Sequence, residues 1–184
     1  MLAAMMLGAI FGGCFPVPVK IGSAPASFDA ARLDGTWYVV ASNFPMWVSG
    51  DKQNPTFRYT LLEDDLEPRK LDDVVWFSKG SGSGTFLGVD EQDSGDPTHF
   101  TWRGKGSLFL FSSEWYVARV APDDTWAIVY YTATIASPDG VDIIARSPTL
   151  SADRMAQAHA TIEEDPLLRA KARGLVPVIR TQLH

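Results

Sequence analysis

The sequence predicts an all-β domain, built as an antiparallel up-and-down barrel or a sandwich of eight or nine strands. Between Gly35 and Arg146, short runs of apolar or alternating residues recur, and each run ends at Gly, Pro, Asp, Asn or Ser. This spacing is typical of consecutive antiparallel strands. Aromatic residues are plentiful, with 10 Phe, 6 Trp and 5 Tyr, and they favour strands over helical bundles.

The strand candidates follow one another without an intervening helical pattern. They are residues 36–42, 56–62, 73–78, 85–90, 99–103, 107–111, 115–120, 126–132 and 141–145. Runs such as 74–77 and 108–111 are apolar at every position, so both faces of these strands must be covered. We therefore expect a packed helix or a lined cavity against one face of the sheet.

One helix follows the strands. Ser151 is its expected N-cap, because a serine side chain accepts a hydrogen bond from the first helical turn, and the pair Asp165-Pro166 is its expected end. A last apolar run, 175–179, is expected to add a short strand or an extended segment. An apolar stripe at spacings of four and three residues places the helix on the outside of the sheet, and it consists of Met155, His159 and Ile162.

The first 27 residues are expected to be a leader and linker, and residues 28–184 the folded domain. Residues 1–13 are apolar and uncharged, too few for a membrane-spanning helix, which needs about 20. Their length fits the core of a signal peptide, and the small residues before Cys14 resemble a bacterial lipoprotein cleavage site. Cys14 would then carry the lipid. The alternative is a buried or disordered leader with an incidental cysteine.

Composition excludes several function classes. The 184 residues suit one domain, and 16 basic against 22 acidic residues give a net charge of −6, which removes the electrostatic case for nucleic-acid binding. The three histidines, at 99, 159 and 184, are scattered without metal-ligand spacing. No phosphate loop, dinucleotide fingerprint or nucleophile–base grouping appears. We expect no catalytic residues, no metal and no cofactor.

Three blocks in order resemble the signatures of the lipocalin family. Residues 28–38 contain Gly35-Thr36-Trp37, residues 115–130 read as strand, acidic turn and strand, and residues 144–151 place Arg146 just before the helix. The first and third blocks are most similar to bacterial outer-membrane lipocalins and the apolipoprotein D group. The resemblance implies an eight-stranded antiparallel up-and-down lipocalin barrel with one C-terminal helix packed outside.

The same resemblance assigns structural roles to three residues. Gly35 would permit the tight turn into the first strand, Trp37 would fill the closed end of the barrel, and Arg146 would pack across the Trp37 indole.

One face of each strand should line the interior, where the side chains either contact a ligand or form ordinary core. An aromatic interior with few charges favours a fatty acid, a lysophospholipid or an apolar pigment. A one-residue error in register would invert any of these choices. The expected ligand-binding residues are Val39, Ala41, Phe44, Trp47, Phe57, Tyr59, Trp76, Phe86, Trp102, Phe109, Phe111, Trp115 and Val117, with Ile128 and Tyr130 as further candidates.

Loop 43–52 is unusually apolar for a connection, since it carries Phe44, Met46, Trp47 and Val48. We interpret it as a lid over the mouth of the barrel. The alternative is contact with a membrane or a partner, which Trp and Phe suit.

The expected function is binding, storage or transport of a small hydrophobic ligand. The expected location is the cell envelope, as an outer-membrane lipoprotein or a periplasmic or secreted protein, with an organellar location not excluded and the oligomeric state left open. One alternative is a lipocalin-fold enzyme acting on a carotenoid or bilin. We expect no acid near a Tyr in the interior, and this expectation argues against the enzyme. Another is a structural subunit of a membrane assembly with an empty barrel.

Overall fold

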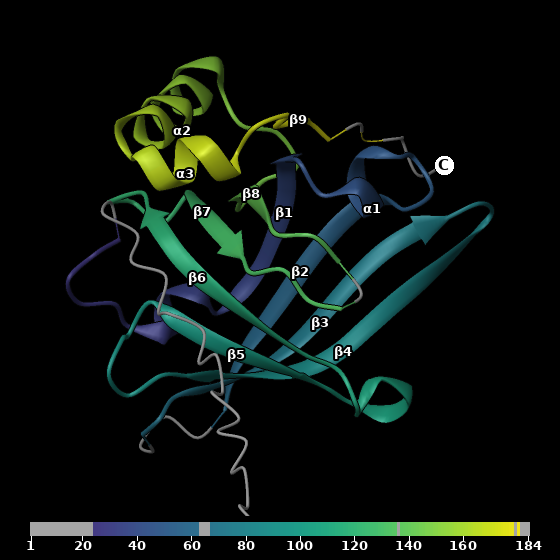
Figure 1. The fold of residues 1–184 in the computed structure, drawn as a ribbon. Helices are drawn as coiled ribbons and strands as arrows, with labels where there is room; N and C mark the ends of the chain where they lie inside the picture. Colours follow the sequence, from purple (N-terminus) through teal and green to yellow (C-terminus); the bar gives the residue numbers. More distant parts are fainter. Residues whose placement is uncertain (1–23, 63–66, 136, 179, 181–184) are drawn as a thin grey trace, which may run out of the picture.

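The computed structural model describes residues 24–62, 67–135, 137–178 and 180, and shows a closed β-barrel with two C-terminal helices on one side (Figure 1). Consecutive strands pair antiparallel from β1 to β8, and β1 also pairs with β8, which closes the barrel. The barrel strands are β1 (Gly35–Ser42), β2 (Gln53–Leu62), β3 (Lys70–Lys79), β4 (Gly82–Gln92), β5 (His99–Gly104), β6 (Ser112–Val120), β7 (Trp126–Tyr131) and β8 (Gly140–Ala145). The predicted eight-stranded antiparallel barrel is therefore confirmed.

The predicted strand at 107–111 is wrong. A short 3-10 helix, η2 (Gly106–Leu108), stands there, and β6 begins only at Ser112. Gly106 adopts a φ of 58°, a turn conformation that favours glycine, and the Gly104 N–H donates to the Phe111 carbonyl at 3.0 Å to close the loop. An apolar run thus lies in an exposed turn, where local pattern alone would place a strand.

The helices differ from the prediction in two details. Helix α2 (Ala152–Glu164) has Ser151 as its N-cap, as predicted, with the Arg154 N–H donating to the serine hydroxyl at 3.4 Å. Pro166 ends α2 but opens a second short helix, α3 (Pro166–Lys171), for which Asp165 is the N-cap, because proline fits the first helical position. On α2 the buried residues are Ala158 and Ile162, whereas His159 is exposed.

Two apolar layers lie on opposite faces of the barrel wall. The interior layer contains Trp37, Trp115 and Phe100, which are the largest fully buried side chains. The outer layer packs β1, β6, β7 and β8 against α2 and α3, which lie beside these strands in Figure 1. This second layer explains why β7 is apolar on both faces and why the outer face of β8 is apolar.

The C-terminal apolar run adds a short strand to the barrel, as expected. Strand β9 (Val176–Pro177) pairs antiparallel with Ala41 and Ser42 at the end of β1. Ile179, also in the predicted run, lies outside the described residues, as do Cys14 and the other residues of the leader up to 23. Among the described residues, no helix is both long and apolar enough to cross a membrane.

Candidate functional site

One end of the barrel is closed by Trp37, as the resemblance implied. The Trp37 indole N–H donates to the Leu33 carbonyl at 2.7 Å, and the Arg146 guanidinium lies 3.8 Å from the centre of the ring. Arg146 also donates to the Arg32 carbonyl at 2.8 Å and to the Thr36 carbonyl at 3.3 Å. The guanidinium therefore joins the end of β8 to the segment that enters β1. Trp37 and Arg146 thus have structural roles.

Gly35 has the backbone conformation that this closure needs. Its φ is 98°, in the region that residues with a Cβ rarely adopt. A Cβ at this position would also lie 3.2 Å from Arg146 Nη1. The turn into β1 and the stacked guanidinium therefore both depend on glycine here.

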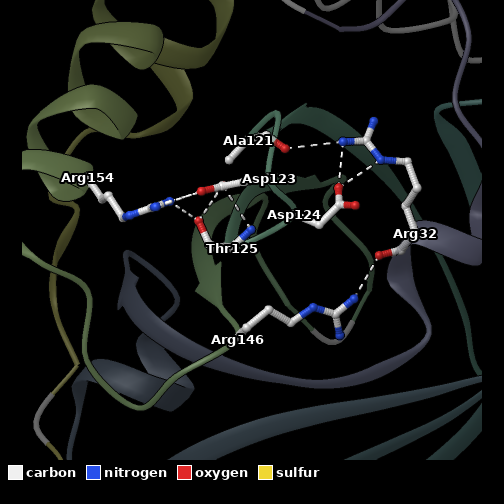
Figure 2. A network of polar contacts seen from close by, with 7 residues as sticks. All are labelled: Arg32, Ala121, Asp123, Asp124, Thr125, Arg146 and Arg154. Carbon is white, nitrogen blue, oxygen red and sulfur yellow. Dashed lines mark hydrogen bonds and ion pairs between the residues drawn. The ribbon is translucent and has the colours of Figure 1, made fainter.

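Ion pairs around the closed end hold the turn between β6 and β7 (Figure 2). Arg32 binds Asp124 with two hydrogen bonds of 2.6 and 2.8 Å, and Arg154 of α2 binds the two Asp123 oxygens at 2.6 and 3.0 Å. The hydrogen bonds from Arg154 and Thr125 hold the pKa of Asp123 well below its usual range. The acidic turn of the second signature is therefore a structural anchor.

The other end of the barrel opens into a cavity of about 540 Å³, within the range of small-molecule sites. Its mouth is bordered by α1 (Pro45–Val48), by the β5–β6 connection and by the β7–β8 connection. Most lining side chains are aromatic or aliphatic, and no Lys, Arg or His belongs to the lining among the described residues. A second hollow of about 570 Å³ lies outside the barrel along α2 and α3, between polar side chains of the helix surface.

Eight of the expected ligand-binding residues line this cavity, and they come from six different elements or connections. The interior faces of β2, β4, β5 and β6 supply most of them, while the lid and the β5–β6 turn supply the rest. They are Phe44, Trp47, Phe57, Tyr59, Phe86, Trp102, Phe111 and Trp115.

Two expected residues lie in the interior core beside the cavity. Val39 and Val117 are fully buried in the inner apolar layer but do not border the cavity.

Three further expected residues lie outside the barrel interior. A register shift between Val39 and Ala41 turns Ala41 to the outer layer, because a bulge reverses the alternation of faces. Trp76 lies on the outer face of β3, since Leu71, Asp73 and Phe77 occupy the buried one. Phe109 sits in the β5–β6 turn and is 71 % exposed.

The two further candidates also face outward. Ile128 and Tyr130 belong to the layer beneath the helices.

Helix α1 covers part of the cavity mouth, as the lid interpretation expects. Phe44 packs edge-on against Tyr131 with ring centres 5.3 Å apart, and Trp47 packs against Phe77 at 6.1 Å. Both Phe44 and Trp47 are buried, whereas Val48 is 41 % exposed. The apolar residues of loop 43–52 are therefore turned mainly toward the barrel.

The interior also holds three buried aspartates that sequence reasoning missed. Asp73, Asp90 and Asp142 come from β3, β4 and β8, and Asp73 and Asp142 border the cavity. Among the described residues, Asp73 Oδ1, Asp90 Oδ2 and both Asp142 carboxyl oxygens make no hydrogen bond of regular geometry. The Trp102 side chain still acts on the Asp73 carboxyl group, and the Ser42 and Trp47 side chains act on that of Asp142. The other Asp90 oxygen accepts a 2.7 Å hydrogen bond from the Trp115 indole. Buried polar atoms without partners are rare in proteins and point to a functional site.

Burial favours the neutral form of these carboxyl groups. It raises the pKa of Asp142 to about 7, and the nearby Ser42 and Trp47 only partly oppose this effect. Burial likewise raises the pKa of Asp90 to about 7. The pKa of Asp73 is raised well above its usual value by burial and by the charge of Asp90.

Two tyrosines adjoin the carboxyl groups. Tyr59 and Tyr131 hydrogen-bond to each other, and burial together with the neighbouring aspartates raises the pKa of both phenols. The expectation that no acid lies near an interior Tyr is therefore wrong. The alternation of residues in β3 could have revealed this acid, because Asp73 lies on the same face of the strand as the apolar Leu71 and Phe77. Finding it required the correct choice of the buried face.

Within the described residues, no three His, Cys, Asp or Glu side chains are grouped so that they could hold a metal ion. The site therefore consists of an aromatic cavity, two bordering carboxyl groups and a pair of phenols.

Comparisons with known proteins agree with this geometry. A family model described as a lipocalin-like domain matches residues 28–171. Insecticyanin from the tobacco hornworm Manduca sexta is 13 % identical, with a TM-score of 0.63 and coverage of 84 % of this chain and 82 % of that one. Lobster apocrustacyanin A1 is 14 % identical, with a TM-score of 0.61 and coverage of 84 % and 81 %.

A siderocalin, Ex-FABP, described as having dual ligand specificities, is 17 % identical with a TM-score of 0.59, and the match covers 83 % of this chain and 96 % of that one. No curated protein sequence matches the chain. These structures share the fold, and the family model covers most of the domain. The chain belongs to the lipocalin family.

Proposed function

We propose that this protein binds a small hydrophobic molecule inside its barrel and stores or carries it. The observation that carries the proposal is the cavity of about 540 Å³, open at one end and lined mainly by aromatic side chains. Burying an apolar ligand there would release about 25 cal/mol for each Å² of apolar surface removed from water. The siderocalin with dual ligand specificities shares this fold, which supports the same use of the barrel.

The test is extraction of the purified protein into organic solvent, followed by mass spectrometry of the extract. We expect a stoichiometric apolar molecule, and its loss from the variant Phe86→Asp, because Phe86 borders the cavity and a carboxylate there would be desolvated by the ligand. Phe109→Asp is the matched control, since Phe109 does not border the cavity. An empty barrel whose tryptophan fluorescence does not respond to added lipids would contradict the proposal.

We also propose that the protein works at the cell envelope with its open end toward an apolar surface. Cys14 follows a charge-free apolar run, which supports lipidation as in the bacterial outer-membrane lipocalins that the sequence resembles. Phe109, Leu110 and Ile135 are 71 %, 79 % and 111 % exposed near the open end, and exposed apolar patches favour such contacts. Intact mass of protein from its native source tests lipidation, since an unmodified Met1 start would refute it.

A lipocalin-fold enzyme is the second candidate, and the buried carboxyl groups favour it. Asp73 acts electrostatically on Tyr59, and a carboxyl with a raised pKa can serve as a general acid at neutral pH. Incubating the protein with an added carotenoid or bilin and analysing the mixture by mass spectrometry tests this candidate. Recovery of both compounds unchanged would contradict it.

A further inference from the structure

The carboxyl groups that border the cavity lack any basic partner. Asp73 and Asp142 are 5 % and 0 % exposed, and three of their four oxygens make no hydrogen bond of regular geometry among the described residues. The side chains that act on them, Trp102 on Asp73 and Ser42 and Trp47 on Asp142, are all uncharged. The Lys, Arg and His residues of the described chain all lie outside the cavity lining. An unpaired buried carboxyl destabilises the folded protein, and no cationic side chain of the described lining offsets this effect.

We propose that the cavity takes an amphiphile whose polar end is a primary ammonium group and whose remainder is an apolar chain or ring. This inference rests on the proposed function and specifies the chemistry of the ligand. The ammonium group would bind the free oxygens of Asp73 or Asp142, and the apolar remainder would contact the aromatic walls.

The donor count favours an ammonium group over other polar ends. An ammonium has three N–H donors and no acceptor, whereas a hydroxyl has one donor and also needs a donor for its own lone pairs. Asp73 Oδ1 and both Asp142 oxygens make no hydrogen bond of regular geometry, and all three are acceptors once the carboxyl groups are ionised. Hydrogen bonds between a cation and a carboxylate are also stronger than those between neutral groups.

The same geometry disfavours an anionic end such as a fatty-acid carboxylate. A carboxylate in the cavity would find no cationic side chain in the described lining, so its charge would be desolvated without a partner. It would also oppose the ionisation of Asp73 and Asp142. The fatty-acid ligand expected from the sequence is therefore the least favoured of the apolar classes.

The walls suit a cation as well as an apolar tail. Trp47, Trp102 and Trp115 border the cavity, and indole rings attract cations over their faces. A cation beside the carboxyl groups would also favour their ionised form and so oppose the effect of burial on the pKa of Asp142.

The experiment uses the full chain and four probes. Diphenylhexatriene, an uncharged fluorescent hydrocarbon, reports on the apolar cavity, and dodecylamine, dodecanol and dodecanoate compete with it at pH 7. We expect dodecylamine to displace the probe at a concentration at least tenfold lower than dodecanoate, with dodecanol between them. Dodecanoate competing as well as dodecylamine would overturn the inference but leave the proposed function standing.

Other outcomes separate the two proposals further. If none of the four molecules binds, as judged also by tryptophan fluorescence, both proposals are refuted. If dodecylamine alone quenches the tryptophans, the inference is supported even though the hydrocarbon probe fails.

Single variants locate the ammonium site. Asp73→Asn and Asp142→Asn remove the charge with little change of shape, and at least one of them is expected to reduce the advantage of dodecylamine over dodecanoate to less than threefold. Asp72→Asn is the matched control, because Asp72 is the neighbour of Asp73 on the opposite face of β3 and pairs with Lys105 at the surface. An unchanged advantage in both cavity variants would contradict the assignment, and the comparison of ligands on the unmodified chain does not depend on the variants folding.

Discussion

Replacing Asp142 by Asn should change how the stability of the barrel depends on pH. Asp142 is fully buried, and burial raises its pKa from 3.8 to about 7. Below about pH 4 the carboxyl is protonated in both the folded and the unfolded chain. Between pH 4 and 7 the unfolded chain loses this proton while the folded chain keeps it, so the free energy of unfolding falls as the pH rises.

The size of the effect follows from the two pKa values. At about 1.4 kcal/mol for each pH unit, the difference between 3.8 and about 7 destabilises the folded protein by about 4 kcal/mol above pH 7. Asn has nearly the same shape and does not ionise, so Asp142→Asn removes this contribution. We expect the variant to gain about 3–4 kcal/mol relative to the unmodified protein as the pH is raised from 4 to 8.

Urea unfolding followed by tryptophan fluorescence at pH 4, 5, 6, 7 and 8 measures the effect. Asp153→Asn is the control, because Asp153 is exposed on α2, and its stability curve should run parallel to that of the unmodified protein. If the Asp142→Asn curve also runs parallel across this range, burial does not shift the titration of Asp142 and the reasoning is refuted.

Three further predictions concern the barrel framework. In Gly88→Ala the new Cβ would lie 2.1 Å from the Trp102 indole nitrogen, so we expect a loss of about 1–3 kcal/mol in urea unfolding and a shifted tryptophan emission; unchanged emission would contradict it. Arg146→Lys should lose the stacking on Trp37 and cost about 1–3 kcal/mol by thermal unfolding, whereas a variant as stable as the parent would show that the stacking contributes nothing. Asp123→Asn should lower the melting temperature at low salt and less so at 1 M salt, since an exposed ion pair is screened; equal effects at both salt concentrations would argue against an electrostatic origin.

The fold could be predicted because its signals are local and repeated. An error of one or two residues in a boundary does not hide the strand runs ended by turn residues. It does not hide the blocks around Trp37 and Arg146 either. The closed end was therefore predictable in chemical detail. The β5–β6 turn was not, because an apolar run such as Phe109 to Phe111 has the same local pattern in a strand and in an exposed turn.

The cavity lining was predictable only where the choice of face was correct. Ala41 was misplaced by a bulge in β1 that no local pattern reveals, and Trp76 by a one-residue error in the face of β3. That second error also hid Asp73, since choosing Trp76 as the interior residue places Asp73 outside. A correct interior face for β3 would have placed an acid beside Tyr59.

The barrel wall is thicker where the outer apolar layer and the helices cover it than where it meets solvent. Strands β7 and β8 are enclosed between the interior layer and the helices, whereas the outer faces of β2, β3 and β4 meet solvent at residues such as Arg58 and Leu87. Figure 1 shows the β3–β4 hairpin extending away from α2 and α3. Backbone amides of β7 and β8 should therefore exchange hydrogen most slowly, and those of β3 and β4 faster. A ligand larger than the cavity would be accommodated by outward movement of the β2–β4 wall, while the wall beneath the helices keeps its shape.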